Sequence, residues 1–170
     1  KLTKNSDDYG NVVYREGDWF ITLKRKQEIL LNCVFGVDID AQAVEVTQLS
    51  LFLKLLEEES LGTTIQTTLL SKVLPDLSSN IKCGNSLVGW DVSTNMGGLS
   101  YAEEMQVNPF DYRTEFSTVF PKGFDALVGN PPYVKEGKID KRVMEHIKNS
   151  YLAAYYQGKM DIWYFFGSFC

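Results

Sequence analysis

The sequence predicts an α/β fold built around a parallel sheet, and three observations support this. A short apolar run at residues 33–38 is followed directly by a segment with the residue spacing of an amphipathic helix. A strand followed by a helix is the opening of a βαβ unit, whose strands are parallel. The three predicted strands also end in polar side chains, and ligands of open α/β sheets bind beyond the carboxyl ends of the strands.

The first 56 residues predict an arm, a helix, a strand and a second helix. Residues 1–20 are polar with scattered aromatic side chains and predict a loop or arm. Residues 21–31 alternate basic and apolar positions and predict a short helix, and residues 33–38 predict a buried strand. Asp40 is the expected N-cap of the next helix. The apolar face of that helix is expected to contain residues at spacings of three and four, namely Ala43, Val46, Leu49, Leu53 and Leu56.

The later part of the chain predicts two further strands. Residues 81–87 read as a strand that runs into a Gly-Asn loop, and residues 126–128 read as a short buried strand. Between them, residues 110–120 predict a short helix within a long connection. Residues 135–148 are charged and predict a partly helical segment, and an aromatic helix is expected from about Lys159.

The composition is that of a soluble globular domain and excludes several classes of protein. With 170 residues, 44% hydrophobic and 23% charged, the chain suits one domain or most of one. The polar start resembles no signal peptide, and no apolar run is long enough to cross a membrane. A net charge of −5 gives no basic signature for nucleic acid.

The cysteines and the histidine give no sign of metal chemistry. Cys33, Cys83 and Cys170 are far apart and form no Cys-x-x-Cys pair, so neither a disulfide framework nor a zinc site is predicted. A reducing cytosol fits this pattern best. His146 is the single histidine, and we expect it to be a residue on the surface of a helix.

One motif, Asn130-Pro131-Pro132-Tyr133, follows the third predicted strand. The prolines fix φ near about −65° and hold Asn130 extended, so the turn is rigid before any ligand arrives. The Asn130 side-chain oxygen and the Pro131 carbonyl can accept hydrogen bonds from one amino group. Tyr133 offers a flat face to a planar ring. These parts fit a heterocycle with an exocyclic NH₂, whereas the plainer alternative is a turn that ends a strand.

Together with this motif, three further segments carry a family resemblance: FGVDID (35–40), NIKCGNSLVG (80–89) and NPFDYRTEF (108–116). Over about residues 25–170, in the same order, the chain resembles the N6-adenine-specific DNA methyltransferases of type IIG restriction-modification enzymes. The resemblance implies a partial Rossmann-like class I S-adenosylmethionine-dependent methyltransferase fold for residues 21–170. An insertion is expected at about residues 88–120.

The resemblance implies a cofactor site at the ends of the first two strands. Asp38 matches the acidic residue that binds the ribose hydroxyls of S-adenosylmethionine, and Ile39 matches the apolar residue against its adenine. Asn85, with Ser86 beside it, occupies the place of the polar residue that meets the amino group of the cofactor's adenine. The wider class often has Asp at this place, and an amide accepts the same hydrogen bond without the assistance of charge.

The resemblance also implies the catalytic residues. Asn130, Pro131, Pro132 and Tyr133 match the residues that hold a target adenine flipped out of double-stranded DNA. An aromatic amine is a poor nucleophile because its lone pair is delocalised, and two acceptors on its N–H bonds draw the nitrogen towards tetrahedral geometry. The lone pair then becomes available for attack on the methyl donor. Positioning and electrostatics suffice, so no general base is required.

One expected part of the family's domain is absent from the sequence. In the family, a first strand and a glycine-rich loop precede Asp38 along the chain. In the sheet, that strand lies between the strands that end at Asp38 and Asn130. No Gly-x-Gly occurs in the 170 residues. We therefore expect the chain to be a fragment of a cytoplasmic restriction-modification enzyme, inactive alone. Nuclease and target-recognition domains are expected elsewhere in the parent protein.

Two alternative functions remain open from the sequence. N5-glutamine protein methyltransferases use the same Asn-Pro-Pro-Tyr turn, although the long segment at residues 88–120 fits those compact enzymes poorly. The second alternative is a non-catalytic, Rossmann-like interaction module, in which the polar residues at the strand ends are only solvated.

Overall fold

The computed structural model of the chain describes residues 10–56, 75–89, 100–120 and 122–167. These residues belong to two compact units. The first unit contains Lys1–Gly36 and Ala41–Lys82, and the second contains Val37–Asp40 and Cys83–Cys170. None of the helices in the described ranges has the length and apolar character that a membrane span requires.

The first unit begins with a β-hairpin where the sequence predicts only a polar arm. Strand β1 (Val12–Arg15) pairs with the antiparallel strand β2 (Asp18–Ile21). The turn residues Glu16 and Gly17 have positive φ angles of 53° and 92°, which match the right-handed twist of a two-residue hairpin. The prediction of an irregular loop is therefore wrong for residues 12–20, and Ile21, predicted to begin a helix, ends β2. Residues 1–9 lie outside the described part.

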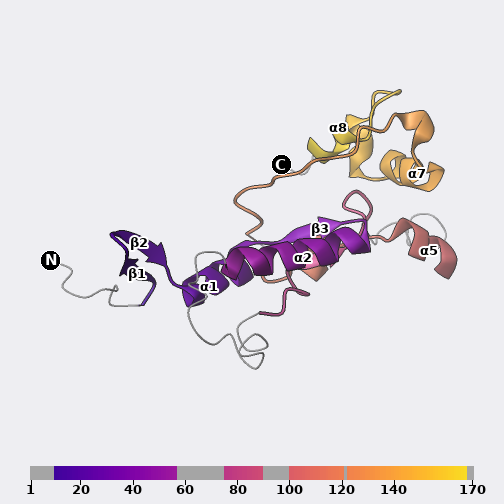
Figure 1. Cartoon of the computed structure of the whole chain (residues 1–170). Coiled ribbons are helices and arrows are strands. Elements are labelled where there is room, and N and C mark those ends of the chain that lie inside the picture. Colours follow the sequence, from indigo (N-terminus) through magenta and orange to yellow (C-terminus); the bar gives the residue numbers. More distant parts are fainter. Residues whose placement is uncertain (1–9, 57–74, 90–99, 121, 168–170) are drawn as a thin grey trace. The chain divides into compact units, whose positions relative to one another are not determined.

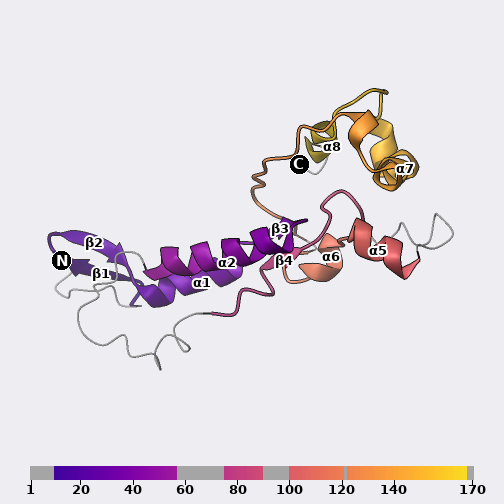
Figure 2. The same ribbon diagram turned by 45° about the vertical axis from the view of Figure 1, so that its right-hand side comes forward.

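Two helices follow the hairpin and lie side by side (Figures 1 and 2). Helix α1 (Leu23–Cys33) is capped by Thr22, whose hydroxyl accepts a hydrogen bond from the amide of Arg25. Helix α2 (Ala41–Leu56) follows strand β3 (Gly36–Asp38), as the sequence predicts. The core of this unit contains apolar side chains from both helices and from the segment after residue 75, namely Leu30, Val44, Leu55, Leu77 and Ile81.

The buried face of α2 differs from the predicted one. Val46, Leu49 and Leu53 are 62%, 57% and 61% exposed, whereas Val44 and Leu55 are buried. The helix carries apolar side chains around most of its circumference, so the spacing of these residues does not select one face. Packing against α1 and the segment after residue 75 makes that selection in the folded protein.

Strand β3 and strand β4 (Ile81–Cys83) form a two-stranded sheet. The amide of Gly36 donates to the carbonyl of Asn80 (2.9 Å), and the amide of Gly84 donates to the carbonyl of Asp38 (2.8 Å). Both strands advance together between these two bonds, so their pairing is parallel. The prediction of an α/β fold is confirmed in this coarse form, a mixed α/β structure with short strands.

Asn80 fixes the start of β4 against the end of α1. Its side chain is 3% exposed, and its Nδ2 donates to the carbonyls of Leu31 and Val34 (2.9 Å each). These carbonyls lie at the end of a helix, where intrahelical donors run out. The Asn80 amide therefore satisfies backbone groups that would otherwise lose their partner in a buried place.

We expect Asn80→Ala to lower the free energy of unfolding by about 2 kcal/mol, because buried carbonyls lose their donor. Urea denaturation of the 170-residue chain, followed by circular dichroism, measures this effect. Asn32→Ala is the matched control, since the Asn32 side chain also donates to a helix carbonyl but is exposed. An Asn80→Ala effect no larger than that of Asn32→Ala would contradict this interpretation.

The second unit contains short helices around a core of its own. Its helical segments are α5 (Tyr101–Val107), α6 (Tyr112–Glu115), the 3₁₀ turn η1 (Glu136–Lys138), α7 (Lys141–Asn149), the 3₁₀ turn η2 (Tyr151–Tyr155) and α8 (Trp163–Phe166). Its core contains Leu87, Val88, Val107, Val143, Met144, Ile147, Leu152 and Phe165.

Three predictions for this unit need correction. The helix predicted at residues 110–120 is the single turn α6, because Asp111 caps its start and Phe116 (φ −119°, ψ 45°) leaves the helical conformation. His146 lies on a helix but is buried, at 5% exposure, rather than on its surface. The aromatic helix begins at Trp163 instead of Lys159, where φ is positive (53°).

The predicted strand at residues 126–128 does not form. Leu127 is 49% exposed and Val128 is fully exposed, and no strand is assigned to this segment. A β-strand requires a hydrogen-bonding neighbour. No hydrogen bond joins residues 126–131 to another described residue. An apolar run does not by itself show whether a neighbouring strand is available to pair with it, so the predicted buried strand is wrong for the described residues.

Candidate active site

The ends of β3 and β4 bring the predicted cofactor residues together. The Gly84–Asp38 hydrogen bond places Asp38 beside the residue that precedes Asn85. The Asp38 side chain is exposed, and its Oδ1 accepts a hydrogen bond from the amide of Asp40 (2.8 Å). A carboxylate has two oxygens with about four acceptor positions, so this local bond leaves capacity for hydroxyl groups. Ile39, next to it, is 59% exposed.

Asn85 is held by its backbone and by its side chain. Its amide donates to the carbonyl of Asn108 (2.7 Å), and its Oδ1 accepts from the amide of Leu87 (3.1 Å). The residue is 9% exposed. An amide oxygen can accept a second hydrogen bond, so the predicted contact with an amino group depends on the remaining lone pair of Oδ1.

Phe110 closes against the same strand end, a role that sequence reasoning missed. A Cβ atom at Gly84 would lie 2.5 Å from Cδ2 and 2.8 Å from Cβ of Phe110. The amide of Phe110 also donates to the carbonyl of Val88 (2.7 Å). Only glycine allows this close approach. The available sequence signal was the glycine before Asn85 together with the Asn-Pro-Phe segment.

Tyr112 contacts the fourth predicted cofactor residue, Ser86. Burial of the Tyr112 ring raises the pKa of its hydroxyl, and a side-chain hydrogen bond with Ser86 opposes that shift. The ring lies edge-on to Phe110, with centroids 5.1 Å apart and planes at 79°. The hydroxyl therefore stays protonated at neutral pH and holds Ser86 in place.

The Asn130–Tyr133 turn is presented to solvent. Asn130, Pro132 and Tyr133 are exposed, Tyr133 at 80%, and Pro131 is half-buried. The carbonyl of Pro132 accepts a hydrogen bond from the amide of Val134 (3.0 Å). Among the described residues, no hydrogen bond or ring contact joins this turn to Asp38, Ile39, Asn85 or Ser86.

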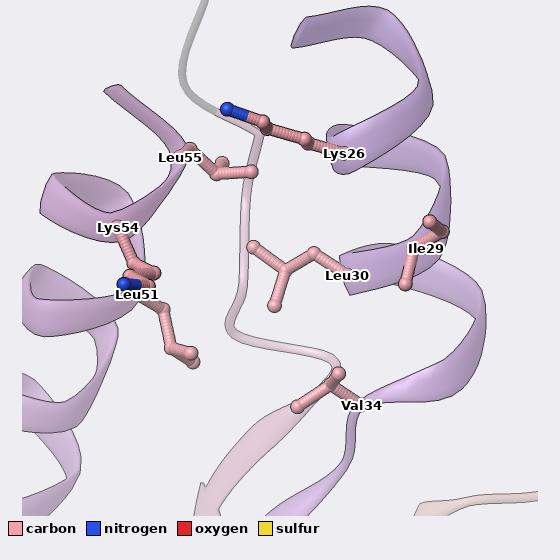
Figure 3. Close-up of a pocket in the computed structure, with 7 residues that line it drawn as sticks. All are labelled: Lys26, Ile29, Leu30, Val34, Leu51, Lys54 and Leu55. Atoms are coloured by element: carbon pink, nitrogen blue, oxygen red, sulfur yellow. The ribbon is translucent and has the colours of Figure 1, made fainter. Parts of the chain in front are cut away.

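A pocket elsewhere in the described part of the chain is of another kind. It lies between α1 and α2, has a volume of about 260 Å³, and is lined by Lys26, Ile29, Leu30, Val34, Leu51, Lys54 and Leu55 (Figure 3). Its lining is aliphatic apart from two lysines and contains no predicted site residue. The lining residues belong to the first unit, whereas every predicted site residue belongs to the second, so this pocket is not the candidate active site.

The class to which these features belong is that of restriction-modification methylases. Residues 32–169 match the model of the Eco57I restriction-modification methylase family, and the chain belongs to this family. The resemblance noted from the sequence is thereby confirmed. The matched region contains the two strand ends, the Asn-Pro-Phe segment and the Asn130–Tyr133 turn.

Two curated proteins are similar to the chain. It is 35% identical over 136 residues to the type II restriction enzyme and methyltransferase RM.Eco57I of Escherichia coli, a match that covers 78% of the chain and 12% of that protein. It is 43% identical over 77 residues to RM.MjaORFECS2P of Methanocaldococcus jannaschii, a protein assigned to the same type, with 45% of the chain and 6% of that protein covered. No solved structure matches the chain.

Proposed function

We propose that the protein containing this chain transfers a methyl group to the N6 amine of an adenine flipped out of double-stranded DNA. The observation that carries the proposal is the rigid, exposed Asn130–Tyr133 turn in a chain of the Eco57I methylase family. The curated relatives combine a methyltransferase with a type II restriction enzyme. The chain matches only a small part of their length, so the proposed activity belongs to the full-length protein.

The chemistry of the turn supports this proposal. The Asn130 side-chain oxygen and the Pro131 carbonyl are two acceptors on one rigid backbone segment. Hydrogen bonds from both N–H groups of an adenine amine would localise its lone pair on nitrogen. Tyr133 has its ring mostly in solvent, where it can stack on an extruded base and offset part of the unstacking cost of a few kcal/mol.

The residues at the strand ends fit S-adenosylmethionine, which supplies the methyl group. Asp38 carries an exposed carboxylate beside β4, as binding to ribose hydroxyls requires. Ile39 offers an exposed apolar side chain next to it. Asn85 and Ser86 lie at the end of the neighbouring strand and are braced by Asn108 and by Tyr112. We assign the cofactor to these four residues.

A methylation assay with the full-length protein tests the proposed function. Wild-type protein is expected to transfer labelled methyl groups from S-adenosylmethionine to adenine in duplex DNA. Tyr133→Ala should reduce the rate by about 10- to 100-fold because about 1–3 kcal/mol of base stacking is lost, whereas Tyr133→Phe should retain most of it. Tyr133 is exposed, so neither variant should alter the thermal unfolding midpoint.

The assay also separates the competing functions. A glutamine-containing protein substrate is offered in parallel with the duplex. Methylation of that protein and not of DNA would show that the protein is an N5-glutamine methyltransferase and not an adenine methyltransferase. Transfer to neither substrate, with no binding of S-adenosylmethionine to the full-length protein, would favour a non-catalytic module.

A further inference from the structure

Glu136 lies three residues after Tyr133, and its carboxylate joins distant parts of the second unit. Its Oε1 accepts hydrogen bonds from the hydroxyl of Tyr156 (2.5 Å) and from Nζ of Lys148 (3.1 Å). Its Oε2 accepts from the backbone amide of Lys159 (2.7 Å). These donors come from α7, from the end of η2 and from the loop before α8.

The charges around Glu136 reinforce these contacts. The hydroxyl of Tyr156, followed by the ammonium of Lys148, lowers the pKa of Glu136, and Glu136 in turn raises the pKa of Lys148. Lys148 Nζ also lies 4.8 Å from the centroid of the Tyr156 ring. Both groups are therefore charged at neutral pH, and the hydrogen bonds to the carboxylate are charge-assisted.

The Glu136 cluster is anchored in the core of the unit. The Tyr156 ring stacks on Phe165, with centroids 6.5 Å apart and planes at 20°. Phe165 is completely buried, in the core cluster that also contains side chains of α7. A displacement of Glu136 would therefore have to disturb a packed core, which resists small shifts.

The backbone next to the turn is tied to the same region. The carbonyl of Val134 accepts a hydrogen bond from the amide of Ile162 (2.9 Å), and Lys135 forms an antiparallel bridge with Asp161. Residues 126–131, which include the first two residues of the turn and the four before them, form no hydrogen bonds with the described residues. Within the described chain, the turn is thus held from its C-terminal side.

We propose that Glu136 is a positioning residue of the methyl-transfer site, which fixes the end of the Asn130–Tyr133 turn and thereby sets the place of the Tyr133 ring. This inference rests on the proposed function for its catalytic consequence. Its structural part, the attachment of the turn through Glu136, stands on the contacts alone. The expected effect is on methyl transfer rather than on binding of DNA or cofactor.

The test uses Glu136→Gln in the full-length protein under single-turnover conditions. An amide has only one acceptor oxygen, so it cannot serve donors on both sides. Methyl transfer is expected to slow by about 10- to 100-fold, as misplacement of a positioned group does. The dissociation constants for DNA and S-adenosylmethionine should stay unchanged, and Glu136→Asp, which keeps both oxygens, should recover part of the rate.

Glu103→Gln is the matched control. Glu103 is likewise a hydrogen-bonded carboxylate beside a cation: it accepts from the amide and the hydroxyl of Ser100 and pairs with Arg142 at 3.8 Å, but it lies on α5. Its loss should leave the methylation rate unchanged. Equal effects of Glu136→Gln and Glu103→Gln would overturn the proposal.

A double-mutant cycle separates positioning of Tyr133 from a general structural role. In a Tyr133→Ala background, Glu136→Gln should slow methyl transfer by less than about twofold, because the ring that it positions is already gone. Rate losses that multiply would overturn the proposal. Should Glu136→Gln fail to fold, Lys148→Met, which removes one donor, is expected to give a smaller rate loss with the same non-additivity.

Hydrogen exchange keeps this inference distinct from the proposed function. In Glu136→Gln protein without substrate, the amides of Val134 and Ile162 should exchange faster than in wild type, because the segment that they tie down is loosened. If exchange is faster in Glu136→Gln but wild-type protein methylates no DNA, the proposed methyltransferase function is rejected, while the attachment of the turn through Glu136 is retained. Unchanged exchange would reject the attachment itself.

Discussion

Alanine in place of Asn130 is expected to reduce adenine methylation by the full-length protein by about 10²- to 10³-fold or more. Removal of one preorganised hydrogen-bonding group from a site of developing charge has effects of this size in other enzymes. The Asn130 side chain is exposed and forms no hydrogen bond with described residues, so the substitution should not destabilise the fold. The loss should therefore be in the rate of transfer, with binding of DNA and S-adenosylmethionine retained.

Single-turnover transfer of labelled methyl groups to a duplex, together with calorimetric titration of the cofactor, measures this outcome. Asn149→Ala is a suitable control because the Asn149 side chain also is exposed and donates only to the carbonyl of Glu145 within α7. If Asn130→Ala protein transferred methyl groups as fast as the control, the assignment of Asn130 as an amine acceptor would be wrong.

Gly84→Ala is expected to lower the free energy of unfolding by about 3 kcal/mol, at the upper end of the usual cost of overpacking. The added Cβ would lie within 3 Å of three Phe110 atoms, Cδ2, Cβ and Cγ. Because Cβ of Phe110 is one of them, rotation of the ring alone does not relieve the clash. A backbone shift here would also displace Asn85, so cofactor binding by the full-length protein should weaken.

Urea denaturation of the 170-residue chain measures the effect on stability. Gly129→Ala is the control, because a Cβ at Gly129 meets no atom within 4 Å and its φ is not positive. A double variant, Gly84→Ala with Phe110→Ala, should be less destabilised than the sum of the single variants, since loss of Phe110 Cγ and Cδ2 removes two of the three close contacts. Exact additivity would show that Phe110 is not the cause.

Local patterns predicted much of the fold. The α1 and α2 helices lie close to the residues expected from apolar runs and cap residues, whereas β3 and β4 form only the last three and the first three residues of the expected strands. The predictions that were wrong concern features that depend on distant residues. The hydrophobic pattern of α2 fits several faces, and tertiary packing chose Val44 and Leu55. The β1–β2 hairpin was missed because Glu16-Gly17 is a less common turn signal than Asn-Gly.

The sequence predicted which residues belong to the candidate site, but not the contacts that hold them in place. The motif at residues 130–133 and the polar strand ends are visible in the sequence because each depends on neighbouring residues. Glu136, Phe110 and Tyr112 act through contacts with residues that lie up to 26 positions away, such as Gly84 for Phe110. No local pattern marks such a pair. Only the folded chain brings those side chains together.

The exposed segment at residues 126–128 has a practical consequence for solubility. Its apolar residues, with Val128 fully in solvent, can pair with the same segment of another molecule, as unpaired strand edges do. Asp125 and Lys135 are the nearest charges on either side and oppose such self-association. Preparations of the 170-residue chain should therefore be kept dilute, and substituting Leu127 by lysine is a direct way to reduce precipitation without touching the turn.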